Sequence, residues 1–328
     1  MGRQGSIGSQ RTRRVATSLS WPDVTAPFAD RLTLRTRELG HPLCVGLDPH
    51  LDGLPSLFRR GSMAPGAKET ADAVAEFGLA ILDRLAGKVA CVKPQMAFFE
   101  ALGWRGIEAL DRLLRAARER DLLVILDAKR GDIGSTAEGY AAASLREEAP
   151  LRADAMTVNP YLGRDSLEPF LAAAERSGAG LFVLVKTSNP GSGDLQDLPA
   201  AGQPVQGQVA AWLAEASPRL LGETGWSGLG AVVGATWPEQ AREARERMPH
   251  NLFLVPGYGA QGAAPADAVA GLRAGPAGGL EGGIVSSSRG VLFPDGSDTT
   301  SAGDWERAID RAVRRAAGEL AHATSSSS

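Results

Sequence analysis

Three charged residues close together in the chain, Asp127, Lys129 and Asp132, have the types and spacing of a proton-transfer array. Asp127 and Lys129 follow the apolar run Leu-Val-Ile-Leu. Because side chains i and i+2 of a strand share a face, these two are predicted to project side by side. Asp132 lies beyond a glycine and belongs to the loop that follows. In such an array, the fixed negative charge of the carboxylates keeps a neighbouring lysine protonated, so that it can donate a proton. The alternative is a structural ion pair at the end of the strand, with Asp132 starting the next helix.

Lysine usage sets the predicted strand ends apart from the rest of the chain. Only five of the 35 basic residues are lysines, and three of them, Lys93, Lys129 and Lys186, stand at the ends of apolar runs. An arginine cannot give up its proton at useful pH, whereas a lysine can. The placement therefore favours proton chemistry by lysine.

The elements that must position these residues are eight short apolar runs separated by longer amphipathic segments. Val, Ile, Leu and Ala dominate the runs with little polar alternation, which is typical of parallel strands covered on both faces. Eight such units predict an α/β fold, a single (β/α)8 TIM barrel, with a doubly wound open sheet as the alternative. The runs span residues 43–48, 89–93, 122–128, 154–158, 180–186, 229–234, 251–255 and 283–287.

The segments between the runs are predicted to be helices. Ser135 and Glu138 have the spacing of a capping box that would start the third of them. The stretch 187–228 is too long for a simple connection, and its first part is predicted to be a mobile loop over the site. The barrel domain is predicted to span 23–322, between a disordered N-terminal extension at 1–22 and a disordered tail at 323–328. The helices are predicted at 66–85, 106–120, 135–145, 165–176, 205–216 and 237–247.

Polar residues gather where the predicted strands end. Barrels of this type hold their active sites at the carboxyl ends of the strands. The opposite ends are mostly uninformative, so the sequence predicts one functional face. Its residues are Asp48, Lys93, Asp127, Lys129, Asn159, Lys186, Ser188, Pro256, Gln261, Ser288 and Arg289.

The last two strand ends predict an anion site. Residues 256–262 read Pro-Gly-Tyr-Gly-Ala-Gln-Gly, and residues 286–290 read Ser-Ser-Ser-Arg-Gly. Glycines let backbone N–H groups approach an anion, Arg289 adds a bidentate donor, and loops after strands seven and eight commonly hold phosphate. The glycines also match the dinucleotide fingerprint G-x-G-x-x-G, with Glu281 near the offset of a ribose acid. That fingerprint belongs to the first turn of an open sheet, so phosphate is favoured over a dinucleotide or a plain tight turn.

Composition excludes several classes of protein. The chain has 328 residues, 43% of them hydrophobic, and a net charge of −3, which gives no general attraction to nucleic acid or to an anionic membrane. No stretch has the apolar length of a membrane-spanning helix. The four histidines have no metal-ligand spacing, so no metal site is predicted. Cys44 and Cys91 lie inside apolar runs and are predicted to be buried thiols, which fits a reducing cytoplasm.

Six motifs together resemble the orotidine 5'-phosphate decarboxylase family, in the variant group found in some bacteria (type 2). Single motifs would be weak, but six in order along an eight-strand pattern are specific. The resemblance runs from about Leu43 to Phe293. The motifs are Val-Gly-Leu-Asp at 45–48, Val-Lys-Pro-Gln at 92–95, Asp-Ala-Lys-Arg-Gly-Asp-Ile at 127–133, Thr-Ser-Asn-Pro-Gly at 187–191, the loop 256–262, and Arg289.

The resemblance implies a reaction and an assembly. The family converts orotidine 5'-monophosphate to UMP and CO2 in de novo pyrimidine synthesis, without a metal or an organic cofactor, and it works as a homodimer. By resemblance, Lys93, Asp127, Lys129 and Asp132 form the charged array, and Lys129 protonates C6 of the pyrimidine. Asp132 reaches the neighbouring subunit's site. The resemblance assigns no role to Lys186, for which a structural ion pair and a catalytic role stay open.

The resemblance also implies a set of substrate contacts. Asp48 binds ribose hydroxyls, Ser188 contacts the pyrimidine, and Gln261 and Arg289 hold the phosphate. Ile133 and Thr136 reach into the neighbouring subunit's site together with Asp132. The whole predicted substrate-binding set is Asp48, Ile133, Thr136, Ser188, Pro256, Gln261, Ser288 and Arg289.

Three other functions remain as alternatives. Sugar-phosphate decarboxylases and synthases of the same superfamily share the D-x-K-x-x-D array but need Mg²⁺ and prefer an acidic ligand where this chain has Lys93. A Schiff-base aldolase needs a lysine isolated in an apolar pocket, whereas Lys129 has two acidic neighbours. A non-catalytic phosphate-binding barrel has no use for a second buried lysine and paired acids.

Overall fold

Eight parallel strands close into a barrel. The computed structural model describes residues 26–259, 262–276 and 278–325. The strands follow one another round the barrel in the order β1-β2-β3-β4-β5-β8-β9-β12, and β1 pairs with both β2 and β12. This closure confirms the predicted TIM barrel and rules out the open sheet. The strands are β1 (Leu43–Leu47), β2 (Cys91–Pro94), β3 (Leu123–Arg130), β4 (Ala155–Val158), β5 (Gly180–Lys186), β8 (Ser227–Val233), β9 (Asn251–Val255) and β12 (Gly283–Ser287).

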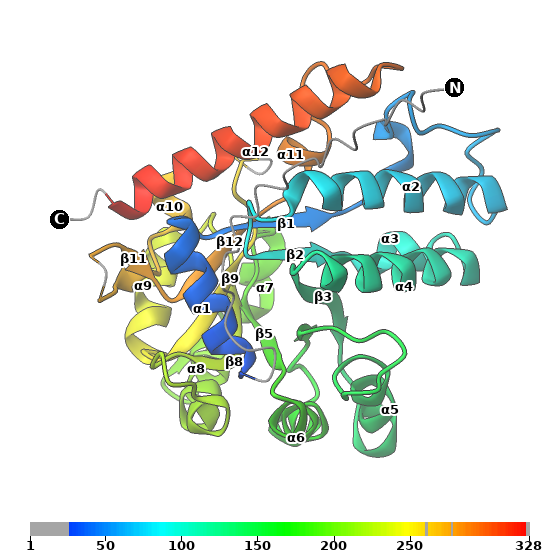
Figure 1. Ribbon diagram of the computed structural model, residues 1–328. Helices are drawn as coiled ribbons and strands as arrows, with labels where there is room; N and C mark the ends of the chain where they lie inside the picture. Colours follow the sequence, from blue (N-terminus) through cyan, green and yellow to red (C-terminus); the bar gives the residue numbers. More distant parts are fainter. Residues whose placement is uncertain (1–25, 260–261, 277, 326–328) are drawn as a thin grey trace, which may run out of the picture.

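Helices surround the strands, as Figure 1 shows. Their apolar faces pack on the outside of the barrel, so the strands are buried on both faces, as the apolar runs require. The long C-terminal helix α12 packs beside α2, α10 and α11 (Figure 1). The helices are α1 (Phe28–Leu39), α2 (Lys68–Leu85), α3 (Met96–Glu100), α4 (Trp104–Glu119), α5 (Gly134–Ser144), α6 (Glu168–Ser177), α7 (Gly193–Gln196), α8 (Val205–Ala216), α9 (Pro238–Arg247), α10 (Pro265–Ala268), α11 (Arg289–Leu292) and α12 (Ala302–Ser325).

Helix α1, which the sequence pattern did not predict, packs against the amino ends of the strands. Phe28 is fully buried and meets the Phe182 ring edge-on, with ring centroids 6.0 Å apart. Arg31 pairs with Asp154 at 2.8 Å, and Asp154 also accepts the Val124 N–H. This packing fills the amino-terminal end of the barrel, which leaves the carboxyl ends of the strands for the site.

The first part of the long connection after β5 contains short elements that the sequence did not predict. The connection contains a 3₁₀ turn (Pro190–Ser192), α7, a short hairpin of β6 (Pro199–Ala200) with β7 (Gln203–Pro204), and then α8. Only α8 was predicted, and its bounds are those expected. The predicted loop is therefore largely folded, because short hydrogen-bonded elements replace open chain. A second hairpin, β10 (Arg273–Ala274) with β11 (Leu280–Glu281), was also not predicted.

Two predicted boundaries were wrong. Helix α5 begins at Gly134 with Ile133 as its N-cap, so Ser135 lies inside the helix and makes no capping box. The Asp132 carboxylate accepts the Ile133 N–H at 2.8 Å just before the helix begins, so the side-chain contact at the helix start comes from Asp132 and not from the predicted Ser135. At the C-terminus, α12 continues through Ser325, so residues 323–325 are helical rather than a tail. The predicted N-terminal extension and residues 326–328 lie outside the described residues.

Two glycines allow loops to approach the strand ends closely. A Cβ atom on Gly46 in β1 would lie 1.9 Å from the Ser288 Oγ. A Cβ atom on Gly234, just after β8, would lie 2.7 Å from the Ser188 Cα. Both glycines therefore set how close the two serines of the predicted site come to the barrel.

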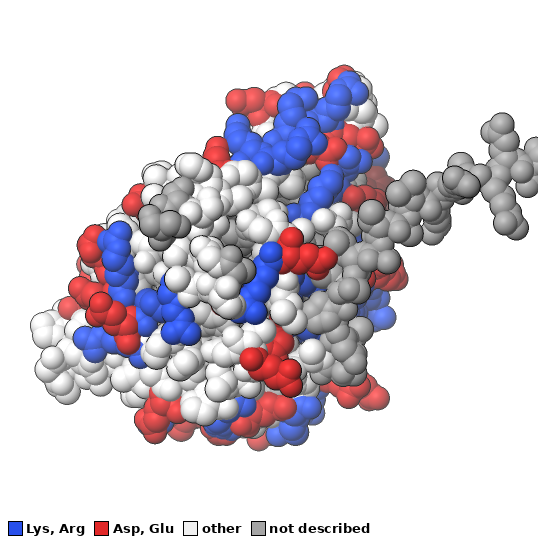
Figure 2. Space-filling model, turned by 60° about the vertical axis from the view of Figure 1, so that its left-hand side comes forward, with Lys and Arg blue, Asp and Glu red and all other residues white. Residues whose placement is uncertain are grey.

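The surface carries mixed charge. On the face drawn in Figure 2, acidic and basic side chains are interspersed, apart from one basic group near the top. No broad face of one sign is visible in this view, in keeping with the net charge of −3. Among the described residues, no helix has both the length and the apolar character needed to span a membrane.

Candidate active site

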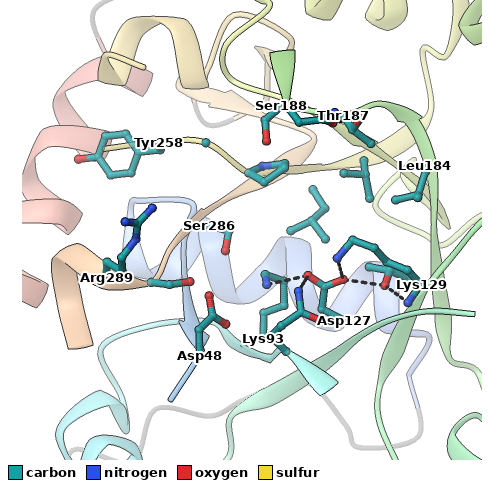
Figure 3. A pocket seen from close by; sticks show the side chains of 18 of the residues that line it. Asp48, Lys93, Asp127, Lys129, Leu184, Thr187, Ser188, Tyr258, Ser286 and Arg289 are labelled. Atoms are coloured by element: carbon teal, nitrogen blue, oxygen red, sulfur yellow. Dashed lines mark hydrogen bonds and ion pairs between the residues drawn. The ribbon is translucent and has the colours of Figure 1, made fainter. Parts of the chain in front are cut away.

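A cavity of about 540 Å³ opens at the carboxyl ends of the strands. Its wall combines charged residues from β2 and β3 with apolar side chains of β5, β8 and β9 and with the loops after β5, β9 and β12. Figure 3 shows the charged array on one side and Arg289 with Tyr258 at the opposite end. Its lining residues are Asp48, Lys93, Gln95, Asp127, Lys129, Thr157, Leu184, Thr187, Ser188, Asn189, Gln196, Val232, Leu254, Pro256, Gly257, Tyr258, Ser286, Ser288 and Arg289.

Asp127 is the hub of the charged array. Its Oδ1 lies 2.5 Å from the Lys129 Nζ, and its Oδ2 lies 2.9 Å from the Lys93 Nζ. Thr157 Oγ1 donates to Oδ1 at 2.9 Å, and Gln95 Nε2 donates to Oδ2 at 3.0 Å (Figure 3). Both carboxylate oxygens therefore have two donors each, which fixes the carboxylate in place.

The array is strongly polarised. Burial alone would raise the pKa of Asp127, but the ammonium groups of Lys93 and Lys129 outweigh it and hold the pKa well below its usual range. Burial would likewise lower the pKa of Lys93, but the carboxylates of Asp127 and Asp48 outweigh it and raise the pKa. Asp127 is thus a carboxylate and Lys93 an ammonium at neutral pH. Lys93 is almost fully buried, whereas the Lys129 side chain is 44% exposed and faces the cavity.

Lys129 reaches Asp127 through an unusual backbone. Its φ is +47°, a left-handed conformation that is costly for a residue with a side chain. The pairing of β3 with β4 shifts between Leu126 and Arg130, and the Lys129 N–H donates to Thr157 Oγ1 at 2.9 Å. The two side chains do meet as predicted, but regular strand alternation is not the reason. A strained residue held by Thr157 brings them together.

Sequence reasoning missed two members of the array, Thr157 and Gln95. Thr157 is buried in β4 and holds both Lys129 and Asp127. The sequence feature that could have identified Thr157 is its hydroxyl group, which lies in an otherwise apolar run and next to the end of the strand. Gln95 is part of the motif at 92–95, but the sequence assigned it no role. A backbone bridge between Gln95 and Asp127 places its side chain beside the carboxylate.

The other end of the cavity is suited to an anion. Gly257 and Gly259 have φ values of +101° and +74°, so the loop after β9 takes a path that other residues rarely adopt. Arg289 is exposed to the cavity, and no carboxylate of the described residues pairs with it. Tyr258 lines the same end, and its hydroxyl donates to Glu319 of α12. An unpaired guanidinium beside glycine backbone is a phosphate-binding arrangement.

Asp48 has an unused acceptor in the cavity wall. Its Oδ1 is buried and has no hydrogen-bond partner among the described residues. A buried acceptor is normally satisfied, so this atom is set to receive a donor from a ligand. A hydroxyl group fits that requirement.

The predicted site residues divide into three groups. Eight line the cavity: Asp48, Lys93, Asp127, Lys129, Ser188, Pro256, Ser288 and Arg289. Asp132, Ile133 and Thr136 lie outside its lining, on the loop and first turn of α5. Within the described part of the chain, Asp132 accepts the Ile133 N–H and makes no hydrogen bond or ion pair with the array. Gln261 lies outside the described residues.

Two further polar residues that the sequence singled out, a strand-end lysine and a possible ribose acid, have partners outside the cavity. Lys186 is fully buried and pairs with Asp197, so it is an ion-pair residue rather than part of the array. Glu281 accepts from Arg37 and from the Trp226 indole, and it lines a different hollow with His41. It is therefore unavailable to a ribose, which agrees with rejection of the dinucleotide fingerprint.

Fold and site together define a (β/α)8-barrel decarboxylase. The chain belongs to the orotidine 5'-phosphate decarboxylase / HUMPS family, whose sequence profile matches residues 41–293. It is 45% identical to the orotidine 5'-phosphate decarboxylase of Rhodopirellula baltica, over 88% of this chain and 96% of that protein. It is 41% identical to that of Deinococcus radiodurans, over 85% and 94% of the two chains. The solved structure of Leishmania donovani OMP decarboxylase superposes with a TM-score of 0.69 at 32% identity, covering 91% of this chain and 98% of that one.

Proposed function

We propose that the protein converts orotidine 5'-monophosphate to UMP and CO2, with Lys129 as the proton donor. The observation that carries this proposal is the Asp127 carboxylate held between two ammonium groups, one of which faces the cavity. At the far end of the same cavity, Arg289 and the glycine loop provide for a phosphate. A pyrimidine nucleotide has its reacting carbon and its phosphate at opposite ends, as this layout requires.

The reaction needs a preorganised cation beside C6. When the C6–carboxylate bond breaks, its electron pair stays on an sp² carbon that has no conventional electron sink. The Lys129 ammonium stabilises that charge and then transfers a proton to C6, leaving a neutral amine that solvent reprotonates. Asp127 lies beside the leaving carboxylate and disfavours it there, and Lys93 keeps Asp127 ionised. Four fixed donors on Asp127 mean that the array needs little reorganisation during the reaction.

The other predicted residues have roles in binding. Asp48 accepts ribose hydroxyls through its unpaired Oδ1. Ser188 contacts the pyrimidine, and Pro256 and Ser288 shape the cavity wall around the nucleotide. Arg289 holds the phosphate together with Gln261. Because the phosphate is remote from C6, its binding energy can help to order the loops around the reacting ring.

The direct test is CO2 release from orotidine 5'-monophosphate by the purified protein in excess EDTA. We expect turnover at the same rate with and without the chelator. Binding of UMP without any CO2 release would instead indicate a non-catalytic phosphate-binding barrel.

The Mg²⁺-dependent sugar-phosphate enzymes of the superfamily are the second candidate. Their metal needs free carboxylate oxygens, whereas both oxygens of Asp127 already have two donors each and Lys93 stands where an acidic ligand would be wanted. Turnover of a sugar phosphate that EDTA abolishes would support this candidate and overturn the decarboxylation of the nucleotide.

Arg289→Ala should weaken binding of the nucleotide phosphate. A charge-assisted contact to phosphate is worth about 1.5–3 kcal/mol, so we expect KM and the Kd of UMP to rise about 10- to 100-fold. Binding of uridine, which lacks the phosphate, should change little. Calorimetric titration of wild type and variant with UMP and uridine measures both. An equal loss for the two ligands would show that Arg289 does not meet the phosphate.

We further propose that the protein acts as a homodimer in which Asp132, Ile133 and Thr136 complete the neighbouring site. In one subunit these residues lie outside the cavity lining, on the same side of the barrel as its opening. Ile133 is 58% exposed and Tyr161, on the next loop, is 74% exposed. Large apolar side chains exposed around a site opening are typical of a protein–protein interface.

Mixing two inactive variants tests the shared site. Lys129→Ala and Asp132→Ala should each be nearly inactive alone. If Asp132 acts across the interface, a mixed dimer has one site with both changes and one site with neither, so CO2 release should reappear after subunit exchange. With random exchange we expect roughly a quarter of all sites to be intact. No recovery in a sample shown to have exchanged would place Asp132 in its own subunit's site.

We place the enzyme in the cytoplasm. Cys44 and Cys91 are both free thiols and fully buried, and they lie side by side in β1 and β2. Paired strand positions that remain unlinked fit a reducing compartment.

A further inference from the structure

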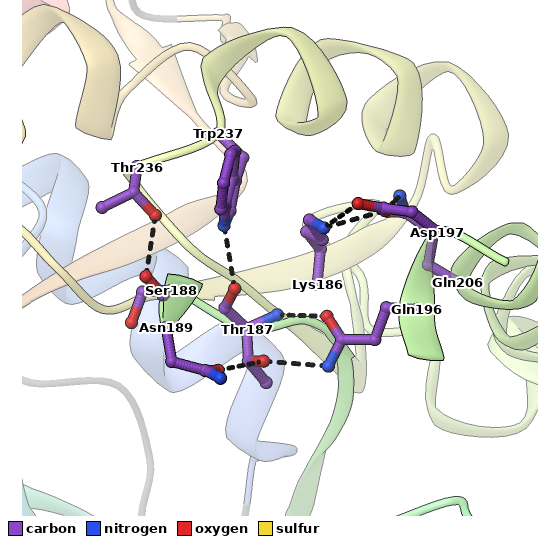
Figure 4. A network of polar contacts seen from close by, with 9 residues as sticks. All are labelled: Lys186, Thr187, Ser188, Asn189, Gln196, Asp197, Gln206, Thr236 and Trp237. Carbon is purple, nitrogen blue, oxygen red and sulfur yellow. Dashed lines mark hydrogen bonds and ion pairs between the residues drawn. The ribbon is translucent and has the colours of Figure 1, made fainter. Parts of the chain in front are cut away.

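Lys186 is a buried lysine that the proposed reaction does not use. Its side chain is 0% exposed, and its Nζ lies 2.8 and 2.7 Å from the two carboxylate oxygens of Asp197. The same ammonium lies 4.7 Å from the centre of the Trp237 ring. Within the described part of the chain, Asp197 is the only carboxylate with which Lys186 pairs (Figure 4).

A strand irregularity turns Lys186 away from the cavity. Leu184, two residues earlier on β5, lines the cavity, and regular alternation would direct Lys186 to the same face. The pairing of β5 with β8 shifts between these two residues. Lys186 therefore points to Asp197 and is absent from the cavity wall.

The residue next to Asp197 binds the end of β5 from the cavity side. Gln196 Oε1 accepts the Thr187 N–H at 2.9 Å, and Gln196 Nε2 donates to Thr187 Oγ1 at 2.8 Å. Gln196 and Thr187 both line the cavity. The end of α7 is thus attached on two sides of β5, by an ion pair and by a paired amide contact (Figure 4).

The β8–α9 connection holds the same loop from its other side. Trp237 Nε1 donates to the Thr187 carbonyl at 3.0 Å, and Thr236 Oγ1 donates to the Ser188 carbonyl at 3.1 Å. Thr187 is therefore held from both sides, by Gln196 of α7 and by Trp237, and it fixes the path of the chain into Ser188 in the cavity wall.

We propose that Lys186 is a positioning residue that acts through Asp197 to clamp α7 over the end of β5 and so fix Ser188 against the substrate. The clamp deepens the proposed decarboxylation and rests on it, because Ser188 is the residue assigned to the pyrimidine. Its physical basis is that an ammonium with no exposed surface needs its counter-ion, so α7 cannot lift without uncovering an unpaired buried charge. Lys186 touches neither the cavity nor the reacting groups, and its effect on turnover passes through the loop.

Hydrogen exchange in the ligand-free protein tests the clamp without reference to activity. Asp197→Asn keeps the side-chain shape and removes the charge. We expect amide exchange in the segment 187–198 to accelerate at least 10-fold, with the rest of the barrel unchanged. Glu215→Gln is the matched control. Glu215 lies on the neighbouring helix α8 and forms an exposed ion pair with Arg164, and loss of this pair should leave exchange and turnover unchanged. Unchanged exchange in 187–198 of Asp197→Asn would overturn the clamp, whatever the substrate proves to be.

A double-mutant cycle tests the link to Ser188. We expect Asp197→Asn and Ser188→Ala each to lower kcat/KM for orotidine 5'-monophosphate about 10- to 100-fold, and the double variant to be little worse than Ser188→Ala alone. A purely structural role would leave kcat/KM of the folded protein unchanged, and multiplying losses would mean that Asp197 acts independently of Ser188; either result overturns the positioning role. Lys186→Met serves the same cycle if Asp197→Asn does not fold. Absence of turnover in wild type would refute the proposed function and leave the exchange result standing.

Discussion

Replacing Lys129 by alanine is expected to reduce CO2 release from orotidine 5'-monophosphate by about 10⁵-fold or more. General-acid groups contribute about 10²–10⁴-fold, and a fixed donor at the site of developing charge contributes about 10²–10³-fold; the role proposed for Lys129 combines both. The variant also removes one of the two donors to Asp127 Oδ1, although Thr157, Gln95 and Lys93 still hold the carboxylate. The protein should therefore fold and bind UMP while losing turnover. Single-turnover measurement of CO2 with excess enzyme gives the rate of the chemical step.

Two further variants separate the proton from the charge. Lys129→Arg keeps a cation near C6 but cannot release a proton at neutral pH, so it should remain severely impaired. Lys88→Ala removes a half-buried lysine that pairs with Asp310 of α12, outside the cavity lining, and it should keep full activity. Substantial turnover by Lys129→Ala would remove Lys129 from the role of proton donor and shift attention to Lys93.

The barrel was predictable because its signal is local. Eight short apolar runs without alternation, each of strand length, are typical of strands covered on both faces, and each of them is a barrel strand. Of the elements that were missed, the two hairpins bury little surface of their own, whereas α12 buries Trp305, Ile309 and Val313 at helical spacing and could have been predicted. Helix α1 is defined by Phe28 packing against Phe182, and the short hairpins have only two residues per strand. Strands of two residues are too short to leave a periodic pattern, whereas the buried residues Phe28, Ala29 and Leu32 of α1 do have helical spacing.

The site was predictable to the extent that strand ends carry it. Lys93, Asp127 and Lys129 were found because lysines are rare in this chain and occur where strands finish. Thr157 was not, because its role depends on the left-handed Lys129 backbone and on the register of β3 against β4, both of which are tertiary features. The shift in β5 that separates Lys186 from the cavity was invisible for the same reason. Strand alternation predicts which face a side chain lies on, but it fails at the irregular strand ends that carry the proposed site.

Asp127→Asn is expected to destabilise the protein by about 3 kcal/mol at neutral pH as well as to impair catalysis. Removing one partner of a buried ion pair leaves the other charge unpaired, which costs about 3–5 kcal/mol, and the asparagine recovers part of that through its remaining hydrogen bonds. Lys93, with a side chain only 6% exposed, is the charge left behind. Urea unfolding at equal protein concentrations measures the difference as a lower midpoint at constant m-value.

The pH dependence of that difference has a definite sign. Because folding lowers the pKa of Asp127, its contribution is fully present above the unfolded value of about 3.9 and is lost as the pH falls towards the folded value. Because folding raises the pKa of Lys93, its contribution is present below the unfolded value of about 10.4 and is lost only as the pH rises through the folded one. The gap between wild type and Asp127→Asn should therefore be constant between about pH 5 and 9 and narrow below about pH 4. Asp72→Asn, which breaks an exposed pair with Lys68, should show little change at any pH. A gap that widened on acidification would mean that Asp127 is protonated in the folded protein, and a carboxylate hub for two lysines could not then be the basis of the site.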